Sequence, residues 1–199
     1  HTRYIGDWSS DVWLFRSHHD QSLDPFPMAR TQPIRPDIAF IPTPDDAIAA
    51  MLDLAQVRAD DVVYDLGCGD GRLLIQAAKL GARGVGIDID PVRIAEAQRL
   101  VFEAGVSDRL QFEQGNLYES HFEAATVVML YLLPHLNVRL LPRLRSQLRP
   151  GSRIVSHQFD MEGWEPDRVV KLIPSEEDST LYLWRSEERR VGKECRSRW

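Results

Sequence analysis

The stretch YDLGCGDGR, residues 64–72, follows the apolar pair Val62 and Val63 and has glycine at three alternate positions. Those glycines are Gly67, Gly69 and Gly71. Glycine lets a backbone turn sharply and approach a ligand closely. A helix that begins directly after such a loop points the N–H groups of its first turn at the ligand. The stretch therefore predicts a buried strand, a tight loop and a helix that together bind a nucleotide.

Two residues indicate which nucleotide the loop suits. The dinucleotide pattern G-x-G-x-x-G needs a glycine at position 72, where this chain has Arg72. Asp65, two residues before the first glycine, would repel a pyrophosphate and attract a ligand that carries an ammonium and a sulfonium group. The loop therefore favours S-adenosylmethionine over NAD or FAD.

The next apolar segment, GVGIDID at residues 84–90, supplies a second contact to the same ligand. Its Asp88 comes 17 residues after the last glycine of the loop. At that spacing a carboxylate at a strand end can accept hydrogen bonds from both ribose hydroxyls. Ile89 can form an apolar wall for adenine. The alternative is that Asp88 and Asp90 both cap the helix that begins at Pro91, which suits Asp90 better than Asp88.

Apolar runs and helical patterns alternate along the chain, which is typical of a mostly parallel sheet with helices on both faces. Helices are predicted over residues 45–57, 72–80 and 91–104, and Thr43 is expected to cap the first. Only the polar segment 174–179 separates the last two strands, so an antiparallel hairpin is expected at one edge. The predicted fold is an α/β, Rossmann-like three-layer sandwich. Its seven strands are expected at residues 62–66, 84–88, 109–114, 125–130, 152–157, 168–173 and 180–184.

Residues 133–148 have the apolar pattern of one long helix, but Pro142 lies inside it. A proline in a helix interior costs about 3 kcal/mol. The sequence therefore predicts a loose turn around residues 135–139 and a helix that begins at Leu141, with Pro142 near its first position.

Both ends of the chain resemble translated sequencing adapter. Residues 1–17 and 185–199 carry this resemblance, and this interpretation excludes them from the fold. The alternative for the C-terminal segment is a basic tail that binds nucleic acid. Residues 18–44 hold six of the 12 prolines and are expected to form an extended arm. Residues 45–184 remain as the predicted folded domain.

The charge balance bears on the partner. The chain has a formal net charge of −6, and residues 18–184 hold 16 basic and 25 acidic residues, a net charge of −9. An acidic surface repels nucleic-acid phosphates, so lysine- or arginine-bearing protein substrates are expected to fit better than DNA or RNA. No apolar run is long enough to span a membrane, so the protein is expected to be soluble. A cytoplasmic location is the default expectation, and the adapter interpretation leaves the presence of a leader open.

The motifs together resemble the class I, seven-strand S-adenosylmethionine-dependent methyltransferases. VVYDLGCGDGR matches the first motif of that family and GVGIDID the second. RLQFEQGNLYE matches the segment whose acidic residue reaches the adenine amino group. Asn116 takes that place here, followed by Leu117, and an amide can also hydrogen bond adenine. The resemblance covers about residues 38–184 and implies S-adenosylmethionine as the cofactor.

A narrower resemblance is to the protein lysine methyltransferases that include a broad-specificity archaeal enzyme and mitochondrial enzymes acting on an ATP synthase subunit and a nucleotide carrier. Its marks are FIPTP before the first helix, YLLP after the fourth strand and SHQFDMEGWEPDR after the fifth. The resemblance implies that Phe40, Pro42 and Thr43 close over the cofactor. It also implies that Leu130 and Tyr131 line the methyl-transfer face.

The predicted methyl transfer requires few catalytic groups. Methyl transfer from a sulfonium mainly requires the nucleophile and the methyl group to be held in line. A lysine nucleophile must also lose its proton, since its reference pKa is about 10.4. Tyr131 can orient the amine, or it is a core aromatic. His157 and Asp160 can accept or stabilise a proton, or the histidine is structural. Cys68 is expected to contribute its backbone, and no cluster has metal-ligand spacing, so no metal is expected.

Three alternatives stay open at this point. The acceptor can be a small molecule, the chain can be a non-catalytic nucleoside-binding module, or it can be an NAD-dependent oxidoreductase, which Asp65 and Arg72 disfavour. DNA and RNA amino-methyltransferases of this fold carry an N-P-P-Y type run where this chain has LYLLP. That difference lowers the expectation of a nucleic-acid acceptor. The sequence does not indicate an oligomeric state.

Overall fold

The computed structural model describes residues 40–174 and 178–187. The predicted segment 1–17, most of the predicted arm and the residues beyond 187 lie outside the described residues. The structure therefore describes the predicted domain, apart from residues 175–177, and the few residues that flank it.

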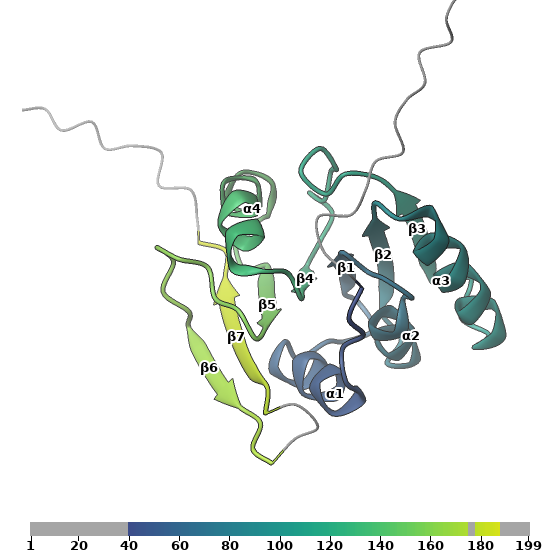
Figure 1. Cartoon of the computed structure of the whole chain (residues 1–199), viewed down its shortest axis with the longest axis horizontal. Coiled ribbons are helices and arrows are strands. Elements are labelled where there is room, and N and C mark those ends of the chain that lie inside the picture. The colour runs from purple at the N-terminus through teal and green to yellow at the C-terminus, as the bar shows by residue number, and fades with distance from the viewer. Residues whose placement is uncertain (1–39, 175–177, 188–199) are drawn as a thin grey trace, which may run out of the picture. The chain divides into compact units, whose positions relative to one another are not determined.

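Seven strands form one sheet, as the sequence predicts (Figure 1). Their order is β3-β2-β1-β4-β5-β7-β6. Strands β1 to β5 run parallel, and β7 pairs antiparallel with both β5 and β6, which confirms the predicted edge hairpin. The strands are β1 (Val62–Leu66), β2 (Arg83–Asp88), β3 (Leu110–Gln114), β4 (Val127–Leu130), β5 (Arg153–His157), β6 (Arg168–Lys171) and β7 (Thr180–Arg185).

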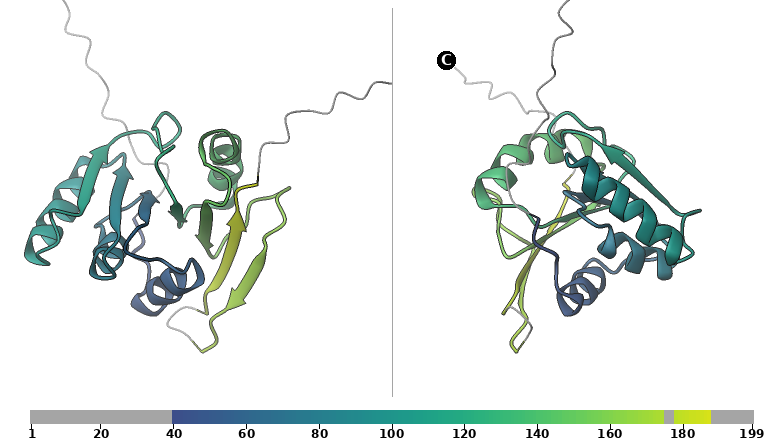
Figure 2. Two further views of the ribbon diagram at one scale, coloured as in Figure 1. Left: turned by 180° about the vertical axis from the view of Figure 1, so that it is seen from behind. Right: turned by 45° about the vertical axis from the view of Figure 1, so that its right-hand side comes forward.

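Helices cover both faces of the sheet, which completes the predicted three layers (Figure 2). Successive strand side chains point to opposite faces, so Val63 packs in one apolar cluster and Tyr64 in the other. The first cluster is covered by α1 (Asp45–Leu54), α2 (Arg72–Lys79) and α3 (Pro91–Glu103), and the second by α4 (Pro134–Gln147).

The carboxyl ends of β1, β2 and β4 meet at one edge of the sheet. Asp65 of β1 lies in register with Gly86 of β2 on one side and Met129 of β4 on the other. The strand order reverses between β1 and β4. Because open α/β sheets bind ligands at such a reversal, the glycine loop after β1 lies where a ligand is expected.

The predicted break before Leu141 is wrong, because α4 is one helix with Pro142 inside it. Leu136, Leu140 and Leu144 are buried at intervals of four residues and pack in one apolar cluster with the sheet. Burial of one such side chain contributes about 1.5–3 kcal/mol. Three of them outweigh the cost of about 3 kcal/mol for an interior proline, so tertiary packing overrides the local signal.

The start of α1 also differs from the prediction. Pro44 occupies the cap position, and no side-chain hydrogen bond caps the helix, so Thr43 is not the cap. The acidic first turn, Asp45 and Asp46, still complements the positive end of the helix dipole. Thr43 is therefore available to the neighbouring pocket.

Strand β7 extends one residue beyond the predicted end of the domain. Arg185 pairs with Arg153, and the next residue, Ser186, donates its N–H to the carbonyl of Ser152 at 2.8 Å. These are backbone contacts, which any residue type can make. The backbone pairing therefore continues past residue 184, where the domain was predicted to end and the adapter segment to begin.

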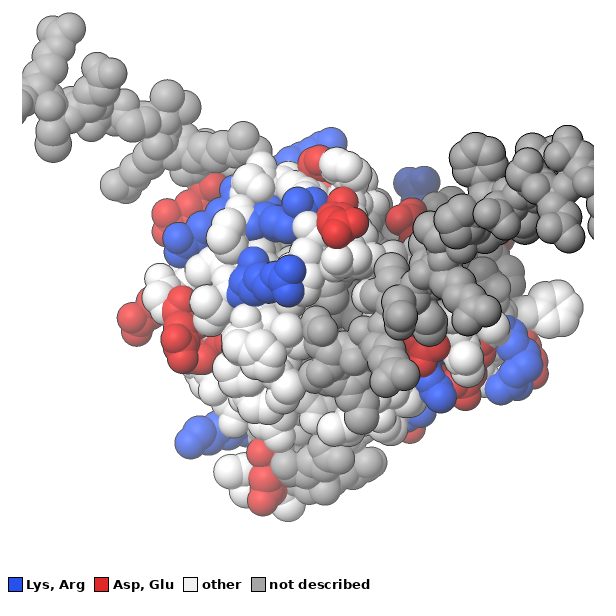
Figure 3. All heavy atoms as spheres, turned by 45° about the horizontal axis from the view of Figure 1, so that its top comes forward, with Lys and Arg blue, Asp and Glu red and all other residues white. Residues whose placement is uncertain are grey.

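Charge is unevenly spread over the surface. Lys and Arg side chains gather over α4 in the space-filling view, with some Asp and Glu side chains beside them (Figure 3). In the described part of the chain, no helix has the length and apolar character needed to cross a membrane.

Candidate active site

The glycine loop has the conformation that its sequence predicts. Gly67, Gly69 and Gly71 have φ angles of 90°, 52° and 76°, a region that residues with a Cβ rarely adopt. The N–H groups of Gly67 and Cys68 donate to the carbonyl of Ile87 at 2.8 and 3.1 Å. These bonds fold the loop over the end of β2, and α2 begins directly after it.

Asp88 joins the end of β2 to the glycine loop. Its Oδ2 accepts the N–H of Gly69, and its Oδ1 accepts the N–H of Asp90, both at 2.9 Å. Asp90 caps α3 by accepting the N–H of Val92 at 2.8 Å, as predicted, so Asp88 is not the cap. Each carboxylate oxygen keeps a second lone pair, with which Asp88 can accept the two ribose hydroxyls.

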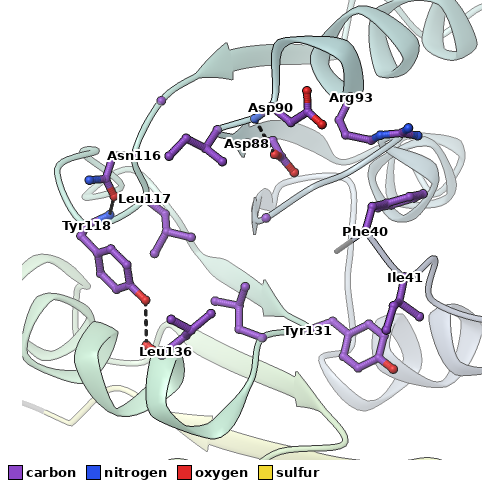
Figure 4. Close-up of a pocket in the computed structure, with 14 residues that line it drawn as sticks. Phe40, Ile41, Asp88, Asp90, Arg93, Asn116, Leu117, Tyr118, Tyr131 and Leu136 are labelled. Atoms are coloured by element: carbon purple, nitrogen blue, oxygen red, sulfur yellow. Dashed lines mark hydrogen bonds between the residues drawn. The ribbon is translucent and has the colours of Figure 1, made fainter. Parts of the chain in front are cut away.

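A first pocket lies over the ends of β1, β2 and β4 (Figure 4). In the figure, Asp88, Asp90 and Arg93 lie along one side of the pocket and Phe40 and Ile41 along another. Five predicted cofactor residues line it, namely Gly67, Asp88, Ile89, Asn116 and Leu117. The remaining lining residues are Phe40, Ile41, Asp90, Arg93, Gly115, Tyr118, Tyr131, Leu132 and Leu136. The mixture of apolar walls and one ribose-binding carboxylate suits an adenosine.

A second pocket adjoins the first and shares Phe40, Ile41, Gly67 and Tyr131 with it. A Cβ atom on Gly69 would lie 2.1 Å from Cε2 of Phe40, so the Phe40 ring rests on the glycine loop between the two pockets. The predicted residues that line the second pocket are Thr43, Asp65, Gly67, Cys68, Leu130 and Tyr131. Gly69 and Gly71 line neither pocket and shape the loop instead.

The second pocket is lined by two carboxylates, Asp65 and Asp70, and by one guanidinium, that of Arg72. Asp65 is buried, and burial, then the neighbouring Asp88 and Asp70, raise the pKa of its carboxyl to about 7. Arg72 lines the same pocket and is held by Asp70, with its Nη2 donating to Oδ2 at 2.7 Å. An ammonium would favour ionised Asp65 and a carboxylate would pair with Arg72. The residues present therefore fit the amino-acid end of S-adenosylmethionine.

Asn116 is committed to its own loop. Its Oδ1 accepts the N–H of Tyr118, and its Nδ2 donates to Oε1 of Glu119, both at 3.0 Å. The side chain thus stabilises the turn after β3 while the residue lines the pocket. The predicted hydrogen bond from Asn116 to adenine stays a prediction.

Of the three predicted catalytic residues, only Tyr131 lines the pockets. His157 is buried behind it, with ring centroids 4.2 Å apart, and its Nε2 lies 2.7 Å from Oγ of Ser179. Its Nδ1 has no hydrogen-bond partner within the described residues. Burial lowers the pKa of His157 to about 4, so the ring is neutral at neutral pH. Asp160 is exposed and lines neither pocket, and its predicted role stays a prediction.

Seven lining residues of the first pocket were not predicted as site residues from the sequence, namely Ile41, Asp90, Arg93, Gly115, Tyr118, Leu132 and Leu136. The guanidinium of Arg93 lies 4.8 Å from the centroid of the Phe40 ring. Tyr118 is part of the NLYE run that carries Asn116, so that motif could have indicated it. Leu136 was missed because the predicted turn at residues 135–139 removed it from a helix.

The fold and the pocket together define a class I S-adenosylmethionine-dependent methyltransferase. Residues 65–168 match the ANTKMT methyltransferase domain family. The chain is 42% identical over 151 residues to the protein-lysine N-methyltransferase of Saccharolobus islandicus, covering 75% of this chain and 94% of that protein. The chain belongs to the ANTKMT methyltransferase domain family.

Other relatives extend the comparison. The adenine nucleotide translocase lysine N-methyltransferase of Mus musculus is 28% identical over 145 residues, which cover 72% of this chain and 63% of that protein. Among solved structures, an RNA methyltransferase from Salinibacter ruber in complex with S-adenosylhomocysteine is 51% identical. Its TM-score is 0.72, and the match covers 74% of this chain and 95% of that one. These likenesses support S-adenosylmethionine as the cofactor.

Proposed function

We propose that this chain transfers a methyl group from S-adenosylmethionine to the ε-amine of a lysine in a protein. The observation that carries the proposal is the 42% identity to a protein-lysine N-methyltransferase over 94% of that relative. The matching family domain, residues 65–168, contains Asp65, Asp88 and Tyr131, which build the two pockets.

The junction of the two pockets is suited to a lysine side chain. Phe40, Ile41 and Tyr131 line both pockets, and Phe40 and Ile41 are 40% and 59% exposed. Apolar side chains of this kind can pack along the four methylene groups of lysine. Removal of water from the amine lowers its pKa from the usual value of about 10.4, which favours the neutral nucleophile.

The reaction then needs little beyond alignment. When bound, S-adenosylmethionine supplies a methyl group on a positively charged sulfur. The lysine nitrogen forms the new N–C bond, the S–C bond breaks with its electron pair going to sulfur, and the nitrogen releases a proton to solvent. Tyr131 borders the path of the amine, and neutral His157 behind it supports the ring without adding a charge. We assign Tyr131 to orienting the amine and His157 to positioning Tyr131.

RNA is the second candidate acceptor, because the 51% identical protein from Salinibacter ruber is described as an RNA methyltransferase. The carboxylates that line the pockets weigh against it. Asp65, Asp70, Asp88 and Asp90 lie there against two arginines, Arg72 and Arg93, and this excess of carboxylates disfavours a phosphate backbone.

A direct competition separates the acceptors. Purified protein is incubated with isotopically labelled S-adenosylmethionine and a mixture of unstructured lysine-bearing protein, total RNA and a small-molecule extract. We expect the label on lysine ε-nitrogen, identified by mass spectrometry after proteolysis, and several-fold less of it with Asp88→Ala at a cofactor concentration below the dissociation constant of the wild type. Label in nucleotides or in small molecules, with none on lysine, would reject the proposal.

A further inference from the structure

The chain between Glu123 and Asp160 contains five arginines and no acidic residue, although the protein as a whole is acidic. Four of these arginines form what we name the α4 arginine cluster. Its members lie on α4 or directly after it: Arg139, Arg143, Arg145 and Arg149. The fifth, Arg153 of β5, forms an ion pair with Asp61 and is therefore neutralised within the fold.

Three of the four side chains of the cluster are held in place by contacts with neutral groups. The guanidinium of Arg139 lies 4.0 Å from the centroid of the Tyr118 ring, and that of Arg145 lies 4.9 Å from the centroid of the Trp164 ring. Arg143 donates from Nη2 to the carbonyl of Ser120 at 2.6 Å. No ion pair joins any of the four to a carboxylate within residues 40–174 and 178–187. The charges of the three exposed members, Arg139, Arg145 and Arg149, are thus available to a partner.

One member of the cluster, Arg139, borders the first pocket. The guanidinium of Arg139 lies over the ring of Tyr118, which lines that pocket. The hydroxyl of Tyr118 donates to the carbonyl of Leu136 at 3.4 Å. Figure 4 shows Tyr118 and Leu136 side by side at the pocket wall formed by α4. Arg139, Arg145 and Arg149 are exposed, and the basic side chains form a visible group over this helix in Figure 3.

The opposite side of the pocket is acidic in balance. Asp88 and Asp90 line it together with Arg93, and Asp65 and Asp70 lie in the adjoining pocket together with Arg72. A partner that fits both sides has a cation next to the carboxylates and anions next to α4. Nucleic acid does not fit this pattern as well, because its phosphates recur at every nucleotide and would also meet the acidic side.

We propose that the α4 arginine cluster binds an acidic segment of the protein substrate that lies next to the lysine to be methylated. This inference rests on the proposed function and adds to it a preference for lysines with Asp or Glu nearby. Arginine suits this role because its planar guanidinium can bind a carboxylate through two parallel hydrogen bonds.

Two triple variants of equal charge test the inference. Arg139→Gln, Arg145→Gln and Arg149→Gln remove three exposed members of the cluster and leave Arg143, which holds the loop at Ser120. The matched control removes three exposed arginines elsewhere, Arg83→Gln, Arg99→Gln and Arg168→Gln. A third variant changes the same three cluster positions to lysine, which keeps the charge.

The probes are three fluorescent molecules measured by anisotropy in the presence of S-adenosylhomocysteine. They are a peptide with one lysine and a run of glutamates, the same peptide with glutamines, and a single-stranded RNA. We expect the acidic peptide to bind the wild type and the control at least tenfold more tightly than the glutamine peptide. The cluster variant should lose at least tenfold, the lysine variant should lose less, and the affinity for S-adenosylhomocysteine should stay the same in all proteins.

Three results would overturn the inference. They are equal affinity for the two peptides in the wild type, an equal loss in the control and the cluster variant, and RNA binding that is tighter than acidic-peptide binding and depends on the cluster. Methylation of the bound peptide is measured separately. An acidic peptide that binds through the cluster but is not methylated would count against the proposed function and not against the binding surface.

Discussion

The two sides of the site are built in different ways. The cofactor side, made of the glycine loop and the end of β2, is fixed by backbone hydrogen bonds, among them those from Gly69 and Asp90 to the Asp88 carboxylate at 2.9 Å. The acceptor side is fixed by side-chain packing between distant segments: Tyr131 follows β4, and His157 ends β5 and contacts Ser179.

This difference predicts which substitutions weaken cofactor binding or activity most. A backbone-built ligand site has little freedom to relax, so single-atom changes on the cofactor side should cost much affinity. A packed wall can adjust its rotamers, so changes on the acceptor side should cost less. We therefore expect the largest effects from substitutions in the glycine loop and the smallest from those behind Tyr131.

Gly69→Ala should have the largest effect. The added Cβ would lie 2.1 Å from the Phe40 ring, at a φ of 52° that alanine disfavours. We expect at least a hundredfold loss of S-adenosylmethionine affinity, about 2.7 kcal/mol, by isothermal titration calorimetry. Gly105→Ala is the matched control, since its φ is 69° and nothing lies within 4 Å of an added Cβ. Equal affinities of the two variants would remove the glycine loop from the cofactor site.

Asp65→Asn should stabilise the protein without cofactor at neutral and higher pH. Below the reference pKa of 3.8 the carboxyl is protonated in both folded and unfolded states. As pH rises from there to about 7, the unfolded state loses the proton first, so the folded state loses stability. Asparagine cannot ionise, and we expect it to raise the free energy of unfolding by on the order of 2 kcal/mol above about pH 7. The gain should vanish near pH 4, and a gain that is equal at both pH values would contradict the buried carboxyl.

The same carboxyl predicts a pH dependence of cofactor binding. A bound ammonium favours ionised Asp65, so binding should release a proton and affinity should increase as pH rises toward about 7. The increase should level off near that pH, because Asp65 is then already ionised. Titration in buffers of different ionisation enthalpy measures the released proton. The Asp65→Asn variant should release none, and an unchanged release would assign the proton to another group.

Asp88→Ala should weaken cofactor binding by at least tenfold, about 1.4 kcal/mol. It removes both the acceptor for the ribose hydroxyls and the anchor of the Gly69 N–H. Asp53→Ala, at an exposed position of α1, is the control for loss of one acidic residue. If adenine alone and adenosine show the same loss of affinity in Asp88→Ala, the carboxylate does not bind ribose.

His157→Ala should have the smallest effect, a threefold to tenfold fall in kcat with the affinity for S-adenosylmethionine unchanged. Removal of the ring loosens Tyr131, while His157→Phe keeps the ring packing and should retain most of the activity. The pH–rate profile between pH 6 and 9 should keep its shape in both variants, since the pKa of His157 is about 4. Loss of one limb of the profile in His157→Phe would instead make His157 a proton acceptor in the reaction.

The same contrast explains what the sequence could predict. The glycine loop, Asp88 and the cap at Asp90 lie within 24 residues of one another in the sequence, and each acts through a local rule of backbone geometry. The seven strands follow from apolar runs of ordinary length. Features that depend on distant packing could not be located in this way. One example is α4, which continues through Pro142. Its leucines are buried against the sheet, and local propensity does not predict that burial.

The acceptor side shows the same limit. His157 and Ser179 are 22 residues apart and meet only because the β6–β7 hairpin folds back on β5. Likewise Arg139 meets Tyr118 across the gap between α4 and the loop after β3. Residue type suggested that His157 accepts or stabilises a proton. In the structure its ring is buried against Tyr131, and burial lowers its pKa to about 4.

The most direct test of the central claim is tandem mass spectrometry of a lysine-bearing protein after incubation with this protein and S-adenosylmethionine. We expect the wild type to form a methyl group on the lysine ε-nitrogen, and we expect Gly69→Ala to lose this product together with cofactor binding. Tight cofactor binding by the wild type with no methyl-lysine, or methyl groups found on RNA instead, would contradict it.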